Sequence, residues 1–149
     1  MSGADLVILQ PVVALMIWTM IMWAWMYATR IPAMQKSPDI DTANLTGGTG
    51  PDLDKILPDN VQWKAHNYNH LHEQPTVFYA VCIVLVLTGQ GDGLNALLAW
   101  IYTGLRVIHS LVQVTANKVM VRFVIFALSG LVLIALILHA SIAVFGNHM

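Results

Sequence analysis

Charged residues are scarce in this chain of 149 residues, because lysine, arginine, aspartate and glutamate together make up only 10% of it. A soluble domain carries about 25% of such residues, so the chain has too few charges to cover a surface that faces water. Hydrophobic residues account for 57% of the sequence. The composition therefore predicts an integral membrane protein that contacts the lipid bilayer.

Cysteine, basic clusters and a cleavable leader pattern are also missing. Cys82 is the only cysteine, which excludes an intrachain disulfide, and it falls in an apolar run where a small buried side chain is expected. The basic residues form no patch and the net charge is −1, so no nucleic-acid partner is expected. Because the first residues lack a basic region and no small-residue cleavage pattern follows, the first apolar run is predicted to be a retained anchor.

Four apolar runs approach the ~20 residues that a membrane-spanning helix needs. We expect one all-α domain over residues 1–149, a four-helix membrane bundle with spans at about 6–29, 61–88, 94–117 and 123–145. Helices are expected because each span must satisfy its own backbone hydrogen bonds in lipid. Residues 30–60 contain four prolines and the sequence GGTG, which predicts a loop rather than a second domain.

Basic residues predict the orientation of these spans. Six of the seven lysines and arginines fall in or beside the first and third connections, and the seventh is Arg106 inside the third span. Because connections rich in lysine and arginine stay on the cytoplasmic side, we expect the loop at 30–60 to be cytoplasmic.

A polar cluster, KAHNYNHLHEQP at residues 64–75, opens the second span. The apolar part that follows is too short to cross a membrane alone, so part of the cluster is expected at membrane depth. His66, Asn69, His70 and Glu73 are spaced three and four apart, which places them on one face of a helix. An ionisable side chain at that depth costs a few kcal/mol unless it faces protein or water.

The third span carries a matching stripe of Arg106, His109 and Gln113, and Arg122 opens the fourth span. One interpretation is a structural polar network that ties the second and third spans together. The other is a pocket for a charged ligand, which intramembrane ionisable residues favour. His66, His70 and Glu73 also have a spacing that could bind zinc, but the order HExxH is absent and no metal ligand is predicted.

Two segments together resemble a known family. KAHNYNHLHEQPTVFYAV and WIYTGLRVIHSLVQVTANKVMVRFVIF are similar to segments of the membrane-associated proteins in eicosanoid and glutathione metabolism (MAPEG). The shared features are a four-span layout, an Asn…Glu…Pro pattern in the second helix and an Arg-x-x-His motif in the third. The form of the Asn…Glu…Pro pattern resembles the bacterial members, which implies a bacterial inner membrane as the location.

The resemblance implies a homotrimer that binds glutathione as co-substrate in a polar pocket between adjacent subunits, with lipophilic substrates approaching from the bilayer. It implies seven site residues: Arg30, Asn69, Glu73, Arg106, His109, Gln113 and Arg122. Arg122 matches the arginine that stabilises the glutathione thiolate, Glu73 matches the residue suited to the γ-glutamyl amine, and Arg30 is expected to reach a carboxylate. Gln113 stands where several eukaryotic members carry a tyrosine.

Three functions follow as hypotheses. The first is a glutathione-dependent transferase or peroxidase for lipophilic electrophiles, since a nearby guanidinium lowers a thiol pKa of about 8.5 and increases the fraction of nucleophilic thiolate. The second is a non-catalytic membrane protein of the same fold that binds a lipid or a partner. The third is a metal-dependent membrane enzyme that uses His66 and His70.

Overall fold

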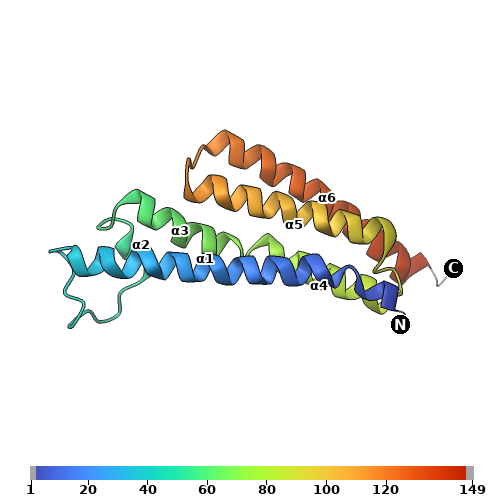
Figure 1. Ribbon diagram of the computed structural model, residues 1–149, viewed down its shortest axis with the longest axis horizontal. Helices are drawn as coiled ribbons and strands as arrows, with labels where there is room; N and C mark the ends of the chain where they lie inside the picture. The colour runs from blue at the N-terminus through green and yellow to red at the C-terminus, as the bar shows by residue number, and fades with distance from the viewer. Residues whose placement is uncertain (1–2, 147–149) are drawn as a thin grey trace.

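The computed structural model describes residues 3–146, and the regular elements in that range are all helical. In chain order they are the 3₁₀ turn η1 (Gly3–Leu6) and the helices α1 (Leu9–Lys36), α2 (Gly50–Leu53), α3 (Asp59–His70), α4 (Gln74–Leu87), α5 (Gly93–Val114) and α6 (Val119–Phe145). The long helices run side by side, with η1 and the end of α6 at one end of the molecule and the loop that carries α2 at the other (Figure 1). The predicted all-α membrane bundle is confirmed.

Four of the helical segments in the described chain are long and apolar enough to cross a membrane. They are α1, α3 together with α4, α5 and α6. The 28 residues of α1 extend about 42 Å at 1.5 Å per residue, more than the ~30 Å of a hydrocarbon core. The chain is therefore a multi-pass integral membrane protein, as its composition predicted.

Helix α5 buries its polar face and exposes its apolar face, the reverse of a surface helix in a soluble protein. Its apolar side chains Leu97, Ile101 and Ile108 are exposed, as a surface in contact with lipid requires. Its polar side chains are buried at positions three and four apart, namely Asn95, Tyr102, Thr103, Arg106, His109, Ser110 and Gln113. The interior of the bundle therefore receives the polar face of α5, and this face supplies part of the site described below.

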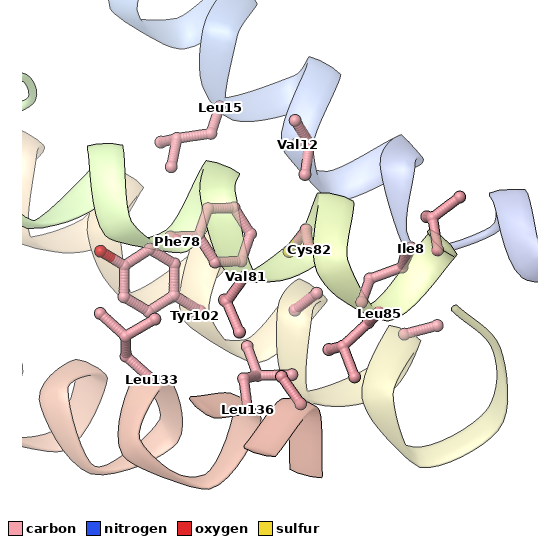
Figure 2. Close-up of a cluster of buried hydrophobic side chains, with 14 of the residues drawn as sticks. Ile8, Val12, Leu15, Phe78, Val81, Cys82, Leu85, Tyr102, Leu133 and Leu136 are labelled. Atoms are coloured by element: carbon pink, nitrogen blue, oxygen red, sulfur yellow. The ribbon is translucent and has the colours of Figure 1, made fainter. Parts of the chain in front are cut away.

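An apolar cluster holds α1, α4, α5 and α6 together (Figure 2). At its centre Phe78 of α4 stacks on Tyr102 of α5 with ring centroids 4.3 Å apart, and both side chains are fully buried. Leu15, Leu85 and Leu136 surround the pair with further buried side chains from α1, α4 and α6. Because Tyr102 also carries a hydroxyl group, this cluster joins the apolar core to the polar site.

The second span is not a continuous helix. Helix α3 ends at His70, α4 begins at Gln74, and Glu73 between them has a non-helical backbone. Pro75 in the first turn of α4 has no N–H to donate to the carbonyl oxygen four residues earlier, so the hydrogen-bond pattern of α3 cannot continue through it. The break places Glu73 on irregular backbone, which is tolerated at membrane depth only where protein or water surrounds it.

The first helix extends beyond the predicted end of its span. Arg30 was expected to stop the span after Thr29, but α1 continues to Lys36 and includes Pro32. A charged residue marks where a span leaves the hydrocarbon, whereas a helix ends where its backbone hydrogen bonds end. Residues 30–36 are therefore helix rather than loop, and the connection to α3 is correspondingly shorter.

The short helix α2 interrupts this connection. The backbone N–H and the hydroxyl of Thr49 both donate to the Asp52 carboxylate, at 2.9 and 2.7 Å, which is a capping box. These hydrogen bonds hold the pKa of Asp52 below its usual range. The connection therefore contains a locally ordered turn, whose contact with α1 is described below.

Gly91 lies in the turn between α4 and α5, where an added methyl group is expected to destabilise the protein. The N–H of Ile8 donates to the carbonyl oxygen of Gly91 at 2.9 Å, and a Cβ at Gly91 would lie 1.8 Å from the carbonyl oxygen of Asp5. We expect Gly91→Ala to destabilise the bundle by about 1–3 kcal/mol through overpacking, measured by thermal unfolding in detergent. Gly104→Ala is the control, because no atom lies within 4 Å of a Cβ added there. Equal midpoints for the two variants would contradict this contact.

Candidate functional site

A polar cavity of about 420 Å³ opens between α3, α5 and α6, on the half of the bundle that carries the break in the second span. This volume falls within the roughly 300–1,000 Å³ of small-molecule sites. Its lining consists of His66, His70, Glu73, His109, Gln113, Val119, Arg122, Phe123 and Phe126. Four of the seven predicted site residues, Glu73, His109, Gln113 and Arg122, thus surround one cavity.

Helix α6 contributes one wall of this cavity. The sequence predicted a fourth span at about 123–145 that Arg122 opens, and the helix itself, α6, begins at Val119, so Arg122 lies in its first turn. The connection between α5 and α6 turns at Asn117, whose φ of 48° lies in the left-handed region typical of helix ends. Val119, Arg122 and Phe126 therefore share one helical face. The Nε atom of Arg122 is buried and has no hydrogen-bond partner in the described chain.

Arg106 lies behind the cavity and connects its parts. The side chain is 1% exposed, and its Nε donates to the hydroxyl of Tyr102 at 3.1 Å. Its Nη1 lies 3.3 Å from Nε2 of His70. The guanidinium also stacks on Phe126, with Cζ 4.9 Å from the ring centroid, so a wall of the cavity is in direct contact with a buried cation.

The side chains of His70 and Glu73 are joined to this cation. Nδ1 of His70 lies 2.8 Å from a carboxylate oxygen of Glu73, and the ring of His70 packs against His109 with centroids 4.9 Å apart. Gln113 is buried one turn after His109, and its side-chain oxygen has no hydrogen-bond partner in the described chain. Buried polar atoms without partners are rare, so the free atoms of Gln113 and Arg122 indicate where a ligand or water would bind.

The structure separates the two asparagines of the polar cluster. Asn69, the predicted ligand-contacting residue, is exposed and does not line the cavity. Asn67 is fully buried instead, and its amide nitrogen donates to the hydroxyl of Ser110 on α5. Two residues that are two positions apart point about 200° away from each other on a helix, so only one of them can face α5. The sequence did not identify Asn67 as a buried polar residue. The only signal for it was its partner Ser110, a polar residue one turn after Arg106 on α5.

Arg30 is also outside the cavity of its own chain. Its Nη2 donates to the side-chain oxygen of Gln62 at 3.1 Å and to the carbonyl oxygen of Gly50 at 3.5 Å. Gln62 in turn donates to the carbonyl oxygen of Leu53 at 2.6 Å. Arg30 thus fastens α2 to the ends of α1 and α3, although its Nε remains without a partner in the described chain.

The histidines of α3 do not form a metal-ligand set. Nε2 of His66 lies 3.0 Å from a carboxylate oxygen of Asp54, and His70 is bonded to Glu73 and Arg106 as described. Within residues 3–146 no group of three or more histidine, cysteine, aspartate or glutamate side chains has the arrangement of a metal site.

The fold defines a multi-pass integral membrane protein, and three of its helices line an open cavity that carries ionisable side chains. The chain belongs to the MAPEG family, whose family model matches residues 8–142. Membership confirms the resemblance noted in the sequence. The family is associated with glutathione and includes transferases and peroxidases as well as non-catalytic members. No curated protein and no solved structure matches the chain significantly.

Proposed function

We propose that this protein is a glutathione-dependent membrane transferase or peroxidase that acts on lipophilic electrophiles, with Arg122 stabilising the thiolate. The observation that carries the proposal is the convergence of Glu73, His109, Gln113 and Arg122 on one cavity between membrane helices. Intramembrane ionisable residues are costly, and residues of this kind mark binding or transport sites by default.

The charges of the cavity complement those of glutathione. The tripeptide has two carboxylates, one ammonium group and a thiol, so its site needs cations or donors together with one anion. Glu73 supplies the anion, Arg122 supplies a permanent cation, and His66 and His109 supply further nitrogen donors or acceptors. Arg106 adds a second permanent cation directly behind Phe126.

Arg122 is suited to act on the sulfur. A guanidinium remains charged at every physiological pH, and a cation beside a thiol lowers the thiol pKa and raises the population of thiolate. In conjugation, the thiolate forms a carbon–sulfur bond with the electrophile. With an aryl halide the electron pair of the carbon–halogen bond leaves with the halide, and with an unsaturated aldehyde the π electron pair moves toward the carbonyl oxygen and the resulting enolate takes up a proton. In peroxide reduction, the sulfur attacks one oxygen, the alcohol leaves, and a second glutathione converts the sulfenic acid to a disulfide and water.

A lipophilic substrate can reach the same place from the bilayer. Phe123 lines the cavity beside Arg122 and is 64% exposed, and most large apolar side chains of α6 are exposed in the same way. The cavity therefore has a polar side on α3 and α5, while on α6 the apolar side chains of Val119, Phe123 and Phe126 surround Arg122. We propose that glutathione occupies the polar side and that the electrophile enters past Phe123.

A homotrimer is part of the proposal. His66, Asn69, His72 and Glu73 are exposed in the single chain although they belong to a membrane-spanning segment. Polar side chains at that depth need protein or water around them, and adjacent subunits would provide it. In such an assembly any contact between Arg30 and glutathione must come from a neighbouring subunit, because Arg30 lies outside the cavity of its own chain.

The orientation in the membrane is likewise a proposal, with the 37–58 connection in the cytoplasm of a bacterial cell. Its test is labelling of single cysteines in intact cells by a membrane-impermeant maleimide, in a Cys82→Ala background. A cysteine at Asn44 is expected to stay unlabelled and one at Gln90 to react. The reverse pattern would show that the basic connections face outward.

The test of the proposed function is turnover by the purified protein in detergent. We expect glutathione-dependent conjugation of an aryl halide or an unsaturated aldehyde, or reduction of a lipid hydroperoxide, with saturation in glutathione. Absence of all three reactions, together with recovery of a stoichiometric bound lipid, would instead support the non-catalytic alternative. Retained turnover after removal of metals by chelation is expected, and its loss would revive the metal-dependent hypothesis.

A further inference from the structure

Two side chains connect Arg106 to the break in the second span, one at Glu73 and one at Gln74. On one side, His70 bonds to Glu73 through Nδ1 at 2.8 Å and to Arg106 through Nε2 at 3.3 Å. On the other side, the hydroxyl of Tyr102 donates to the side-chain oxygen of Gln74 at 3.3 Å and accepts from Arg106 at 3.1 Å. Arg106 is therefore connected through His70 to Glu73 at the break and through Tyr102 to Gln74 at the start of α4.

The geometry determines which nitrogen of His70 carries the proton. A guanidinium has only donors, so Nε2 of His70 must accept a hydrogen bond from Arg106. An imidazole that accepts at Nε2 carries its proton on Nδ1 and donates from there. The bond to Glu73 thus runs from His70 to the carboxyl group, and an oxygen of Glu73 is held as the acceptor.

We propose that His70 is a positioning residue that links Arg106 to Glu73 and orients the Glu73 carboxylate toward the ammonium group of glutathione. The inference rests on the proposed function for its ligand, but the link itself is a property of the free protein. It deepens that function by assigning recognition of the amino end to three residues, of which only Glu73 contacts the ligand.

The need for such a link follows from the positions of the two charges. Arg106 is buried, and in the described chain no carboxylate lies within ion-pair distance of its guanidinium. Glu73 is close enough to interact with it electrostatically, but its side chain is 66% exposed and sits on non-helical backbone. Without His70 the carboxylate would be free to rotate away. The ring of His70 is itself fixed, since it packs between His109 and Phe126 at 4.9 and 5.5 Å.

The first test reads the tautomer without any ligand. Nitrogen-15 spectra of protein labelled at histidine are expected to show His70 with a protonated Nδ1 and an unprotonated Nε2, the minority form of free imidazole. The signal is assigned by its loss in His70→Gln. Arg106→Met removes the donor to Nε2 and should shift the Nε2 resonance, while Nδ1 stays protonated because it still donates to Glu73. A native His70 that is protonated at Nε2 would overturn the proposed link.

The second test measures dissociation constants for glutathione and for its analogue without the α-amino group. His70→Phe keeps the ring packing but removes both nitrogens, and we expect it to weaken glutathione about tenfold, the value of one charge-assisted hydrogen bond, with little change for the analogue. His70→Gln offers an acceptor and a donor and should restore most of the affinity. His72→Phe is the matched control, because its contacts in the described chain are with Tyr68 alone.

The outcomes separate the positioning role from the proposed function. Equal loss for both ligands, or equal effects of His70→Phe and His72→Phe, would show that His70 is only structural. If the wild-type protein binds neither ligand, the proposed function fails and the assignment of the amino end fails with it. The nitrogen-15 spectra still decide whether Arg106, His70 and Glu73 form the link.

Discussion

Replacing Arg122 with alanine is expected to lower the rate of glutathione conjugation by about a hundred- to a thousandfold, the usual effect of removing one preorganised donor to a reacting charge. Arg122 is the one permanent cation among the side chains of residues 3–146 that line the polar cavity. Without it, the bound thiol should be protonated at neutral pH and the thiolate absorbance of the complex should disappear. Stability should change little, since Arg122 forms no ion pair with another described side chain.

Two further variants make the result specific. Lys118→Ala removes the cation four residues before Arg122, at the start of α6. Lys118 is exposed and lies outside the cavity, so the turnover of this variant should equal that of the wild type. Arg122→Lys keeps the charge without the fork of donors and should retain part of the activity. Full activity of Arg122→Ala, or equal losses in Arg122→Ala and Lys118→Ala, would remove Arg122 from the chemistry.

Replacing Arg106 with alanine is expected to cost about 2–4 kcal/mol of stability, as the loss of a large buried side chain does. The change leaves a cavity beside Phe126 and removes the donor to both Tyr102 and His70. The measurement is the midpoint of thermal or denaturant unfolding of the protein in detergent.

Arg106→Met separates packing from charge. Methionine fills a similar volume and avoids the cost of burying an ion, and a buried charge can often be replaced by an apolar group with little loss of stability. We therefore expect near-normal stability for this variant but weakened binding of glutathione, since Glu73 loses its connection to Arg106 through His70. If both stability and binding are normal, Arg106 and its connection to Glu73 through His70 have no part in binding glutathione.

Much of the fold could be predicted from the sequence, because a membrane imposes simple requirements on it. Apolar runs of sufficient length and the scarcity of charge predicted four helical spans, and the described chain contains four such segments. The ends of the helices were less predictable. Arg30 marks a change of environment rather than the end of α1, and the left-handed backbone of Asn117 starts α6 before Arg122.

The candidate site was predictable in its composition but not in its geometry. Helical spacing placed Arg106, His109 and Gln113 on one face of α5, and all three are buried. Asn67 and Asn69 lie in the same helix, α3, and point nearly opposite ways, and the sequence alone does not say which of them faces α5. The exposed Asn69 was therefore expected at the cavity, while the buried Asn67 and the bridging role of His70 were not recognised.

The central claim is that the charged cavity between α3, α5 and α6 binds glutathione, and the most direct test is a cryo-electron microscopy structure of the protein saturated with glutathione. The account predicts ligand density in this cavity, with the sulfur beside the guanidinium of Arg122 and the amino end beside Glu73. Density at another place, or an unchanged cavity at saturating glutathione, would contradict it.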